Sequence, residues 1–464
     1  SCKSPLRLRL LRPELLRALA ACGSLLRMKS STLLTILIVT AMVLGALVGE
    51  YVLFDPSGEG DLSIWKRAGD LILIRPLKLL VIPLVLFSVV AGITRIGDPR
   101  KLGVVGGATL VYYFATMIIA VTIGALLVTA IQPGGLSPDV QLSLQQTGEA
   151  AFMADTQLQE RVSSDVSEQD AWINLLYQLI PSNVVERMSA GQPLGIIIFA
   201  IGLGLAFAAG GEKTKVARDF FDAGFEGLMI LVQWIIWLTP PGVFFLVAWT
   251  VGRIGLDNIT GPLGAYMGTV FLGLLLHGVI VLPIVLYFFA RTNPYRFMAK
   301  MKPALLTAFG TDSSSATLPV TIETAIDEGE CSENASNFVL PLGSTINMDG
   351  TALYEAVAVV FLFQLYGIEL GTAELVLVII TATLAAVGAA GIPSAGLVTM
   401  VIVIGAVNGS LAGGDTPLLP VAAIGVILGV DRILDMCRTT VNVWGDAVGA
   451  RIMTRLAPDD PPTE

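Results

Sequence analysis

Residues 371–411 read GTAELVLVIITATLAAVGAAGIPSAGLVTMVIVIGAVNGSL, an apolar stretch interrupted at 388–396 by small residues, a proline and a serine. Each flanking half is too short to cross about 30 Å of hydrocarbon as one helix. Residues 303–326 have the same form, with a polar interruption at 311–315. A pair of interrupted apolar segments in one half of a chain indicates helical hairpins that enter the membrane and turn back inside it. Two ordinary kinked helices are the alternative interpretation.

The composition supports a membrane location for the rest of the chain. Of 464 residues, 54% are hydrophobic and 14% are charged, and the mean hydropathy is +0.77. An average soluble domain has about 25% charged residues. Long apolar stretches occupy 31–52, 70–94, 103–132, 172–211, 219–252 and 260–290. The net charge of −9 argues against a nucleic-acid partner. We therefore expect an all-α polytopic membrane protein.

The charges of the connecting segments predict the orientation of the chain. Basic residues gather after the second, fourth and sixth apolar stretches, which places those loops in the cytoplasm. Residues 135–170 hold seven acids and one base and predict a mobile external loop. The first 27 residues are basic, and three interpretations remain open for them: a cytoplasmic arm, an amphipathic surface helix, or an extension preceding a start at Met28.

A polar run, Gly343-Ser344-Thr345-Ile346-Asn347-Met348-Asp349-Gly350-Thr351, lies between two apolar runs. Asn, Asp and Gly disfavour helix interiors, so this run predicts a membrane helix that is unwound in its middle and exposes carbonyl oxygens. Carbonyls beside a carboxylate suit a hard cation such as sodium. An Asx turn is the structural alternative.

The last apolar segment has one polar face. Its polar residues are Asp431, Asp435, Arg438, Asn442 and Asp446. At 100° per residue they fall within a stripe of about 80°, and Thr439 lies at its edge. Such a face inside a membrane must contact protein, water, ions or substrate. A purely structural ion-pair network is the alternative interpretation.

The balance of charge within these segments favours a cation-coupled site. Residues 334–366 and 421–450 contain five acids, Asp349, Glu355, Asp431, Asp435 and Asp446, against two bases, Arg432 and Arg438. Buried carboxylates without partners cost several kcal/mol each, so the excess acids should bind cations or protons. The guanidinium of Arg438 suits a carboxylate ligand and Asp435 suits an ammonium group, which together describe an acidic amino acid.

Other chemistries find less support. Four cysteines show no CxxC spacing, so neither a disulfide framework nor a zinc site is indicated. The single histidine, His277, lies in an apolar run and is interpreted as a core or interface residue. An intramembrane hydrolase could use the serines at 313–315, but no base accompanies them, and we expect no enzymatic activity. An ion channel would also explain intramembrane carboxylates.

Four ordered motifs closely resemble the dicarboxylate/amino acid:cation symporter family, which includes glutamate and aspartate transporters. They are FGTDSSSATLP at 309–319, NMDGT at 347–351, AGIP at 390–393 and DMCRTTVNVWGD at 435–446. The resemblance covers about residues 30–455, and a prokaryotic source is our expectation. It implies eight transmembrane helices plus two re-entrant helical hairpins, arranged as inverted repeats in a homotrimer that works by an elevator motion.

The resemblance also divides the chain into segments. They are an N-terminal arm or non-native extension at 1–29, scaffold helices one and two at 30–100, transport-domain helix three at 101–132, the external loop at 133–170, scaffold helices four and five at 171–253, transport-domain helix six at 254–295, hairpin one at 296–330, helix seven at 331–368, hairpin two at 369–413, helix eight at 414–453 and a cytoplasmic tail at 454–464. Both termini are expected in the cytoplasm and the protein in the prokaryotic inner membrane.

Site residues are carried over by matching motif. The resemblance implies that substrate contacts Ser314, Thr351, Ile392, Gly396, Asp435, Arg438, Thr439 and Asn442. It implies that sodium is held by Tyr113, Thr116, Gly343, Thr345, Asn347, Asp349, Asn442 and Asp446. Glu355 matches the glutamate of the animal transporters that is thought to carry a proton. No organic cofactor is expected.

The sequence departs from the family at several of these places. Met117 replaces a serine beside one sodium site, and Asp312 and Met436 stand where relatives carry a second pocket arginine. These changes leave ion stoichiometry and potassium counter-transport open. Import of glutamate or aspartate with sodium, protons or both is the predicted function. A C4-dicarboxylate symporter is the nearest alternative, ahead of a neutral amino acid exchanger.

Overall fold

The computed structural model describes residues 30–54, 62–96, 99–156, 158–159, 180–190, 193–254, 263–388, 395–411 and 417–459. Within these ranges the secondary structure is helical and contains no strand. Six helical segments of the described chain are long and apolar enough to cross a membrane. The expected all-helical membrane architecture is therefore confirmed. The N-terminal arm at 1–29 and Ile392 lie outside the described residues.

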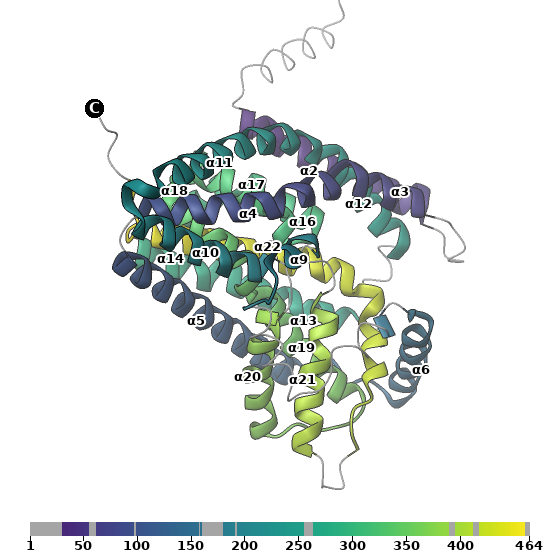
Figure 1. The fold of residues 1–464 in the computed structure, drawn as a ribbon. Coiled ribbons are helices and arrows are strands. Elements are labelled where there is room, and N and C mark those ends of the chain that lie inside the picture. Colours follow the sequence, from purple (N-terminus) through teal and green to yellow (C-terminus); the bar gives the residue numbers. More distant parts are fainter. Residues whose placement is uncertain are drawn as a thin grey trace, which may run out of the picture.

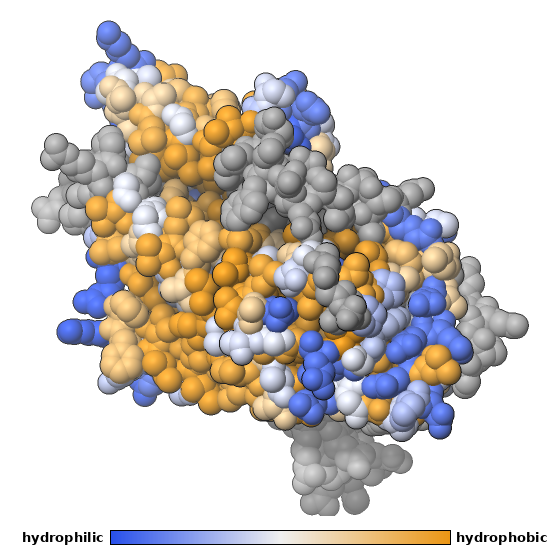
Figure 2. Space-filling model, turned by 90° about the horizontal axis from the view of Figure 1, so that it is seen from below, coloured by the Kyte–Doolittle hydropathy of each residue, from blue (hydrophilic) through white to orange (hydrophobic). Residues whose placement is uncertain are grey.

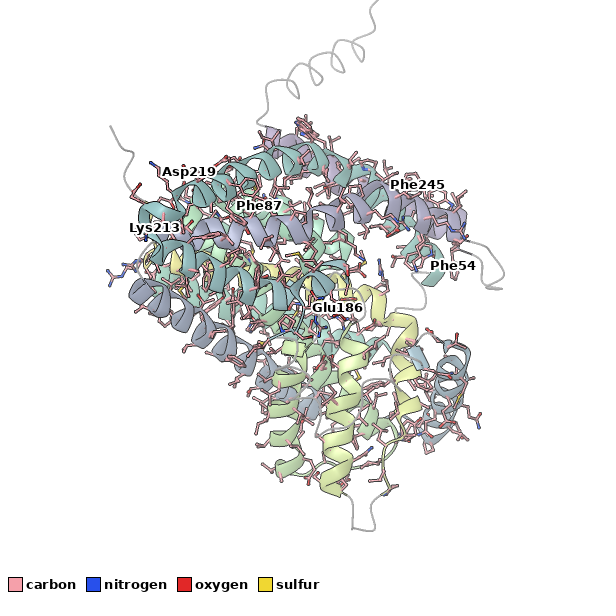
Figure 3. The ribbon with its side chains drawn as sticks, viewed as in Figure 1. Phe54, Phe87, Glu186, Lys213, Asp219 and Phe245 are labelled. Atoms are coloured by element: carbon pink, nitrogen blue, oxygen red, sulfur yellow. The ribbon has the colours of Figure 1, made fainter. Side chains whose placement is uncertain are left out.

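One group of helices forms the upper layer in Figure 1. Its members are α2 (Ser30–Val48), η1 (Gly49–Leu53), α3 (Ser63–Gly69), η2 (Asp70–Ile74), α4 (Arg75–Ile96), α9 (Val184–Ser189), α10 (Pro193–Ala209), η3 (Gly211–Thr214), α11 (Lys215–Ile235), η4 (Ile236–Leu238) and α12 (Thr239–Ile254). Helix α2 packs along α12, and α4 packs along α10 and α11. The turn at Lys213 and the chain at Phe54 lie at opposite ends of this layer (Figure 3).

Most of the other helices form a second group, part of which lies behind the upper layer and part of which extends below it (Figure 1). Its members are α5 (Pro99–Ile131), α13 (Gly264–Leu275), η6 (Leu276–Val281), α14 (Leu282–Ala290), α15 (Pro294–Lys300), α16 (Lys302–Thr311), α17 (Ser314–Asp327), α18 (Glu333–Ile346), α19 (Asp349–Leu365), α20 (Thr372–Gly388), α21 (Ala395–Leu411), η7 (Val421–Ile427) and α22 (Leu428–Met453). Helices α18 and α19 are buried along nearly their whole length, with α5, α13 and α22 packed against them.

The interruptions noted in the sequence become breaks between helices. Helix α16 ends at Thr311 and α17 begins at Ser314, and the two helices contact each other as a hairpin. Helix α18 ends at Ile346 and α19 begins at Asp349, so the chain is unwound at Asn347 and Met348, as predicted. Helices α20 and α21 also contact each other. The breaks leave backbone groups without helical partners in the middle of the molecule.

The polar segment 135–170, expected to be a mobile external loop, differs in part from expectation. Residues 138–154 form helix α6 (Pro138–Ala154) rather than a mobile loop, so the prediction was wrong there. Pro138 occupies the first turn, where its missing N–H costs nothing, and Asp139 favours the same end. Phe152 is buried, and α6 packs against η7. The mostly polar composition of 135–170 gave no indication of the apolar face through which α6 packs against η7.

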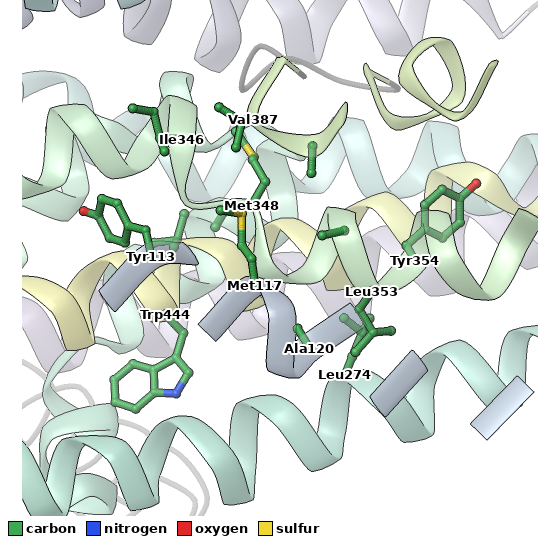
Figure 4. Close-up of a cluster of buried hydrophobic side chains, with 14 of the residues drawn as sticks. Tyr113, Met117, Ala120, Leu274, Ile346, Met348, Leu353, Tyr354, Val387 and Trp444 are labelled. Atoms are coloured by element: carbon green, nitrogen blue, oxygen red, sulfur yellow. The ribbon is translucent and has the colours of Figure 1, made fainter. Parts of the chain in front are cut away.

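The surface agrees with a membrane environment. Much of the face in Figure 2 is hydrophobic, with hydrophilic patches toward its edges. Large apolar side chains such as Leu79, Val111 and Phe288 are exposed, as lipid-facing positions require. The interior cluster in Figure 4 surrounds Met348 with Tyr113, Met117 and Val387. The break between α18 and α19 is thus enclosed by packed side chains.

Candidate functional site

Helix α22 directs its polar stripe into the protein. Asp431, Asp435, Arg438, Asn442 and Asp446 are all at most 3% exposed. The Arg438 Nε atom donates to Asp435 Oδ1 at 2.8 Å, and its Nη1 atom lies 3.4 Å from Asp431 Oδ1. A buried cation without partners would be very costly, and these two carboxylates compensate it.

An aromatic side chain completes the surroundings of the guanidinium. The Tyr354 ring of α19 lies 4.3 Å from Arg438 Cζ, a cation–π distance. The Tyr354 hydroxyl donates to Asp431 Oδ1 at 2.7 Å. Tyr354 of α19 therefore contacts both members of the Arg438–Asp431 pair and fixes the orientation of the Arg438 guanidinium.

The start of α19 is fastened to α22 by one amide. Asn442 Oδ1 accepts from the backbone N–H groups of Gly350 at 2.7 Å and Thr351 at 3.4 Å. Its Nδ2 atom donates to Thr351 Oγ1 at 3.1 Å. These bonds satisfy N–H groups that the first turn of a helix leaves open. The NMDGT run and the polar stripe therefore meet at Asn442.

Several of the expected substrate residues lie together around Arg438. Thr439 Oγ1 donates to Asp435 Oδ1 at 3.3 Å. A Cβ added to Gly396 would lie 2.8 Å from Arg438 Nη1, so the start of α21 closes over the guanidinium, and a side chain at 396 would have to displace it. Ser314 is buried in the first turn of α17, with no contact to Arg438 among the described bonds.

A second polar cluster lies further along α22. Asn347 Nδ2 donates to Asp446 Oδ1 at 2.9 Å. A Cβ on Gly343 would lie 2.4 Å from Asp446 Oδ1 and 2.6 Å from the Tyr113 hydroxyl, so glycine lets the carboxylate approach the α18 backbone. The Tyr113 hydroxyl donates to the Val339 carbonyl at 2.7 Å. Four expected sodium residues are thus neighbours.

Two oxygens in this cluster fit a cation. Within the described chain, Asn347 Oδ1 and Asp349 Oδ1 are buried and have no hydrogen-bond partner. Both are hard ligands of the kind sodium takes, as are the carbonyls at the end of α18. Thr116 and Thr345 direct their hydroxyls to carbonyls of their own helices, at 3.1 Å for Thr116 to Tyr112 and 3.1 Å for Thr345 to Leu342. These two residues would contribute through other atoms or after rotation.

The single histidine is part of this cluster. His277 Nε2 lies 3.0 Å from Asp349 Oδ2, and both side chains are fully buried. The sequence interpretation as a core residue was correct for its burial but missed this contact. His277 lies in η6, one turn of π-helix. The only available signal was a lone histidine within an apolar run.

Glu355 lies deeper in α19 and is fully buried. Thr399 of α21 donates to its Oε1 atom, while Oε2 has no hydrogen-bond partner within the described residues. Thr399 was not identified from the sequence, because its spacing from Glu355 carries no local pattern.

Arg432 changes the count of charges made from sequence. It forms an ion pair with Asp312, the residue between α16 and α17, and Asp312 was not in that count. Arg432 is therefore not the partner of the acids on α19 and α22. Arg438 is left with Asp431 and Asp435, while Asp349, Glu355 and Asp446 have no arginine or lysine partner among the described ion pairs.

The fold and this site define a multi-pass membrane transporter with a buried cluster of ionic side chains beside an unwound helix. The profile of the "Sodium:dicarboxylate symporter family" matches residues 34–456, and the chain belongs to this family. Family membership implies sodium coupling.

The chain is similar to several characterised transporters. It is 37% identical to "Excitatory amino acid transporter 3" of Mus musculus over 90% of this chain and 84% of that protein. It is 36% identical to "Excitatory amino acid transporter 1" of Ambystoma tigrinum, over 90% and 82%. It is 34% identical to "Neutral amino acid transporter B(0)" of Homo sapiens, over 93% and 82%.

Proposed function

We propose that the protein is a secondary active symporter that imports the acidic amino acids L-glutamate and L-aspartate with sodium, protons or both. The observation that carries this proposal is the buried pair Arg438–Asp435 beside Asn442 and Thr351. The side-chain carboxylate of the substrate replaces Asp435 on the Arg438 fork, and the freed Asp435 receives the ammonium group. Gly396 and Ser314 border the ligand.

The relatives support this class but do not separate its members. Their names include excitatory and neutral amino acid transporters, so the choice between acidic and neutral substrates rests on Arg438 and Asp435. A neutral amino acid would leave Arg438 without a second carboxylate to bind. A C4-dicarboxylate has no amine, so Asp435 would remain on Arg438 or face a carboxylate. The pair favours a ligand with both charges.

Uptake into proteoliposomes tests the substrate. Labelled glutamate or aspartate should accumulate in wild-type vesicles with an inward sodium gradient, and Arg438→Ala should abolish this uptake. Arg451→Ala is the matched control, because Arg451 lies at the far end of α22, 20% exposed, near Glu330. Unchanged uptake in Arg438→Ala, or stronger competition by succinate than by aspartate, would overturn the assignment.

The coupling ions are assigned to the polar cluster around Asn347 and Asp446 and to Glu355. One sodium is held by Asp446 with the carbonyls of Gly343, Asn347 and Asn442. A second is held by Tyr113, Thr116, Asn347 and Asp349, and a third by backbone carbonyls of Thr345 and the second hairpin. Glu355 is the proton-coupling candidate. A sodium titration of substrate affinity should be steep in wild type and shifted to higher sodium in Asp446→Asn. A flat titration in wild type would assign coupling to protons, and Glu355→Gln should then abolish uptake.

The oligomeric state, the membrane topology and the moving parts belong to the same proposal. The protein forms a homotrimer in the prokaryotic inner membrane, with eight transmembrane helices, two re-entrant hairpins and cytoplasmic termini. Helices α2, α4 and α10 to α12 serve as the scaffold, and the group around α18, α19 and α22 moves as an elevator. The arrangement of two packed helical groups supports this division. The apparent mass of the detergent-solubilised protein and interprotomer cross-linking measure the oligomeric state.

A further inference from the structure

Asp312 lies in the turn between α16 and α17, directly before Ser313 and the proposed substrate residue Ser314. Its backbone is left-handed, with φ 46° and ψ 34°, a conformation that aspartate tolerates better than most residues. Ser313 follows it and caps α17, its Oγ accepting from Ala316 N at 3.1 Å. The Asp312 side chain is 1% exposed. The carboxylate is thus the inward-facing group of the hairpin tip.

Arg432 of α22 joins this tip to two other elements. Its guanidinium forms the ion pair with Asp312, and its Cζ atom lies 5.3 Å from the ring centroid of Trp249 in α12. Lys66 Nζ lies 5.0 Å from the same ring, so one indole contacts two cations. Helix α12 also packs against α16 and α22. One side chain therefore links α12, α22 and the hairpin of α16 and α17.

The Asp312–Arg432 ion pair also keeps the Asp312 carboxylate separate from the charges around Arg438. Helices α16 and α17, on either side of Asp312, both pack against α22, the helix that carries Asp431, Asp435 and Arg438. Without Arg432, Asp312 would be a buried carboxylate near two others, and Arg438 would be the remaining guanidinium among these residues. The Asp312 carboxylate would then compete with Asp435, and with any substrate carboxylate, for the guanidinium of Arg438.

We propose that Arg432 is a positioning residue for substrate binding, a role that rests on the proposed function. Through Asp312 it fixes the tip that precedes Ser314 against α22, and it keeps the tip carboxylate away from Arg438. Trp249 orients the guanidinium from the side of α12. Arg432 contacts the hairpin and not the ligand, so its effect is on how well the pocket is assembled.

Transport kinetics test the role. Arg432→Met and Asp312→Asn should each raise the KM for aspartate about tenfold or more, which corresponds to about 1.4 kcal/mol. Exchanging the two charges, with Asp312→Arg and Arg432→Asp together, should restore the KM to within about threefold of wild type. Lys66→Met is the matched control, because it removes the other cation on Trp249 without touching Asp312. A KM unchanged in Arg432→Met, or a defect that the exchange does not correct, overturns the proposal.

A second measurement does not depend on transport. In a background without the native cysteines, a Ser315→Cys thiol should react slowly with a maleimide, because Ser315 is 8% exposed. Adding Arg432→Met should raise the rate about tenfold, and the charge exchange should lower it again. Failure of wild-type uptake would reject the acidic amino acid assignment, whereas an unchanged labelling rate would reject the role of Arg432.

Discussion

Single side chains in this protein derive their roles from what surrounds them. Arg438 has two carboxylates and an aromatic ring as neighbours, whereas Arg432 has one carboxylate and the Trp249 ring. Two arginines of one helix therefore have different partners. The same dependence applies to glycines, whose missing Cβ lets charged groups and backbones approach each other.

Gly350 should be among the least replaceable residues. A Cβ there would lie 2.4 Å from the Arg438 carbonyl oxygen, which belongs to the backbone and cannot move freely. We expect Gly350→Ala to lower the free energy of unfolding by about 1–3 kcal/mol. Gly268→Ala is the control, since a Cβ there meets nothing within 4 Å. Thermal unfolding in detergent measures both, and equal melting temperatures would contradict the expectation.

The pair Lys300–Glu330, outside the membrane segments, should make stability depend on pH. The hydrogen bond from Lys300 lowers the pKa of Glu330. Because the pKa is lower in the folded state, the stabilisation is present above the unfolded value near pH 4.3 and is lost as pH falls through the folded value. Lys300→Met should therefore lower the melting temperature at pH 7 but not at pH 3. A difference that persists at pH 3 would contradict this origin.

At the scale of elements, the breaks in helices matter more than their lengths. Helices α18 and α19 would be one long apolar helix without Asn347 and Met348, and α16 and α17 would continue without Asp312 and Ser313. Each break turns a helix end, with its open backbone groups, toward the interior. Polar sites thus arise where two helix ends meet the stripe of α22.

Helix α6 is held by a contact between two glycines. A Cβ on Gly425 would lie 1.8 Å from the Gly148 carbonyl oxygen. We expect Gly425→Ala to detach α6 from η7 and to speed hydrogen exchange and proteolysis within 138–154 at least tenfold, since a backbone clash of this size cannot relax locally. Gly429→Ala, where a Cβ meets nothing within 4 Å, should leave both rates unchanged. Equal protection in the two variants would argue against this docking contact.

At the scale of the whole molecule, two helical groups meet along α4, α12 and α2. Helix α4 contacts α17 and α18, and α2 contacts α16. Arg432 and Trp249 lie at this boundary. Movement of one group past the other would change these contacts and leave the interior of each group intact.

The loop charges predict which ends of the helices face the cytoplasm. Lys213 follows α10 and is exposed, and Ala373 at the start of α20 is exposed as well. With the native cysteines replaced, a Lys213→Cys thiol should resist a membrane-impermeant maleimide in whole cells, whereas Ala373→Cys should react. Labelling of both from the outside would contradict the assigned orientation.

The sequence predicted what depends on local pattern. Apolar length indicated helices such as α5 and α13, polar interruptions indicated the breaks at 312–313 and 347–348, and a spacing of three and four residues indicated the buried face of α22. Contacts between distant elements were missed, namely His277 with Asp349, Asp312 with Arg432 and Thr399 with Glu355. A contact between side chains that are far apart in the sequence produces no periodic pattern of residue types from which it could be predicted. Helix α6 was missed because its single apolar face is narrow.

The stripe of α22 has a consequence for biogenesis. This helix carries six charged side chains, Asp431, Arg432, Asp435, Arg438, Asp446 and Arg451. A charged residue at the centre of a helix costs about 2.5–3.5 kcal/mol on entering the bilayer through the translocon. Such a segment would stay in the aqueous exit channel if it were made first. It is synthesised after α18 and α19, which are then already available to receive its polar face. The order of helices along the chain is therefore also a workable order of insertion.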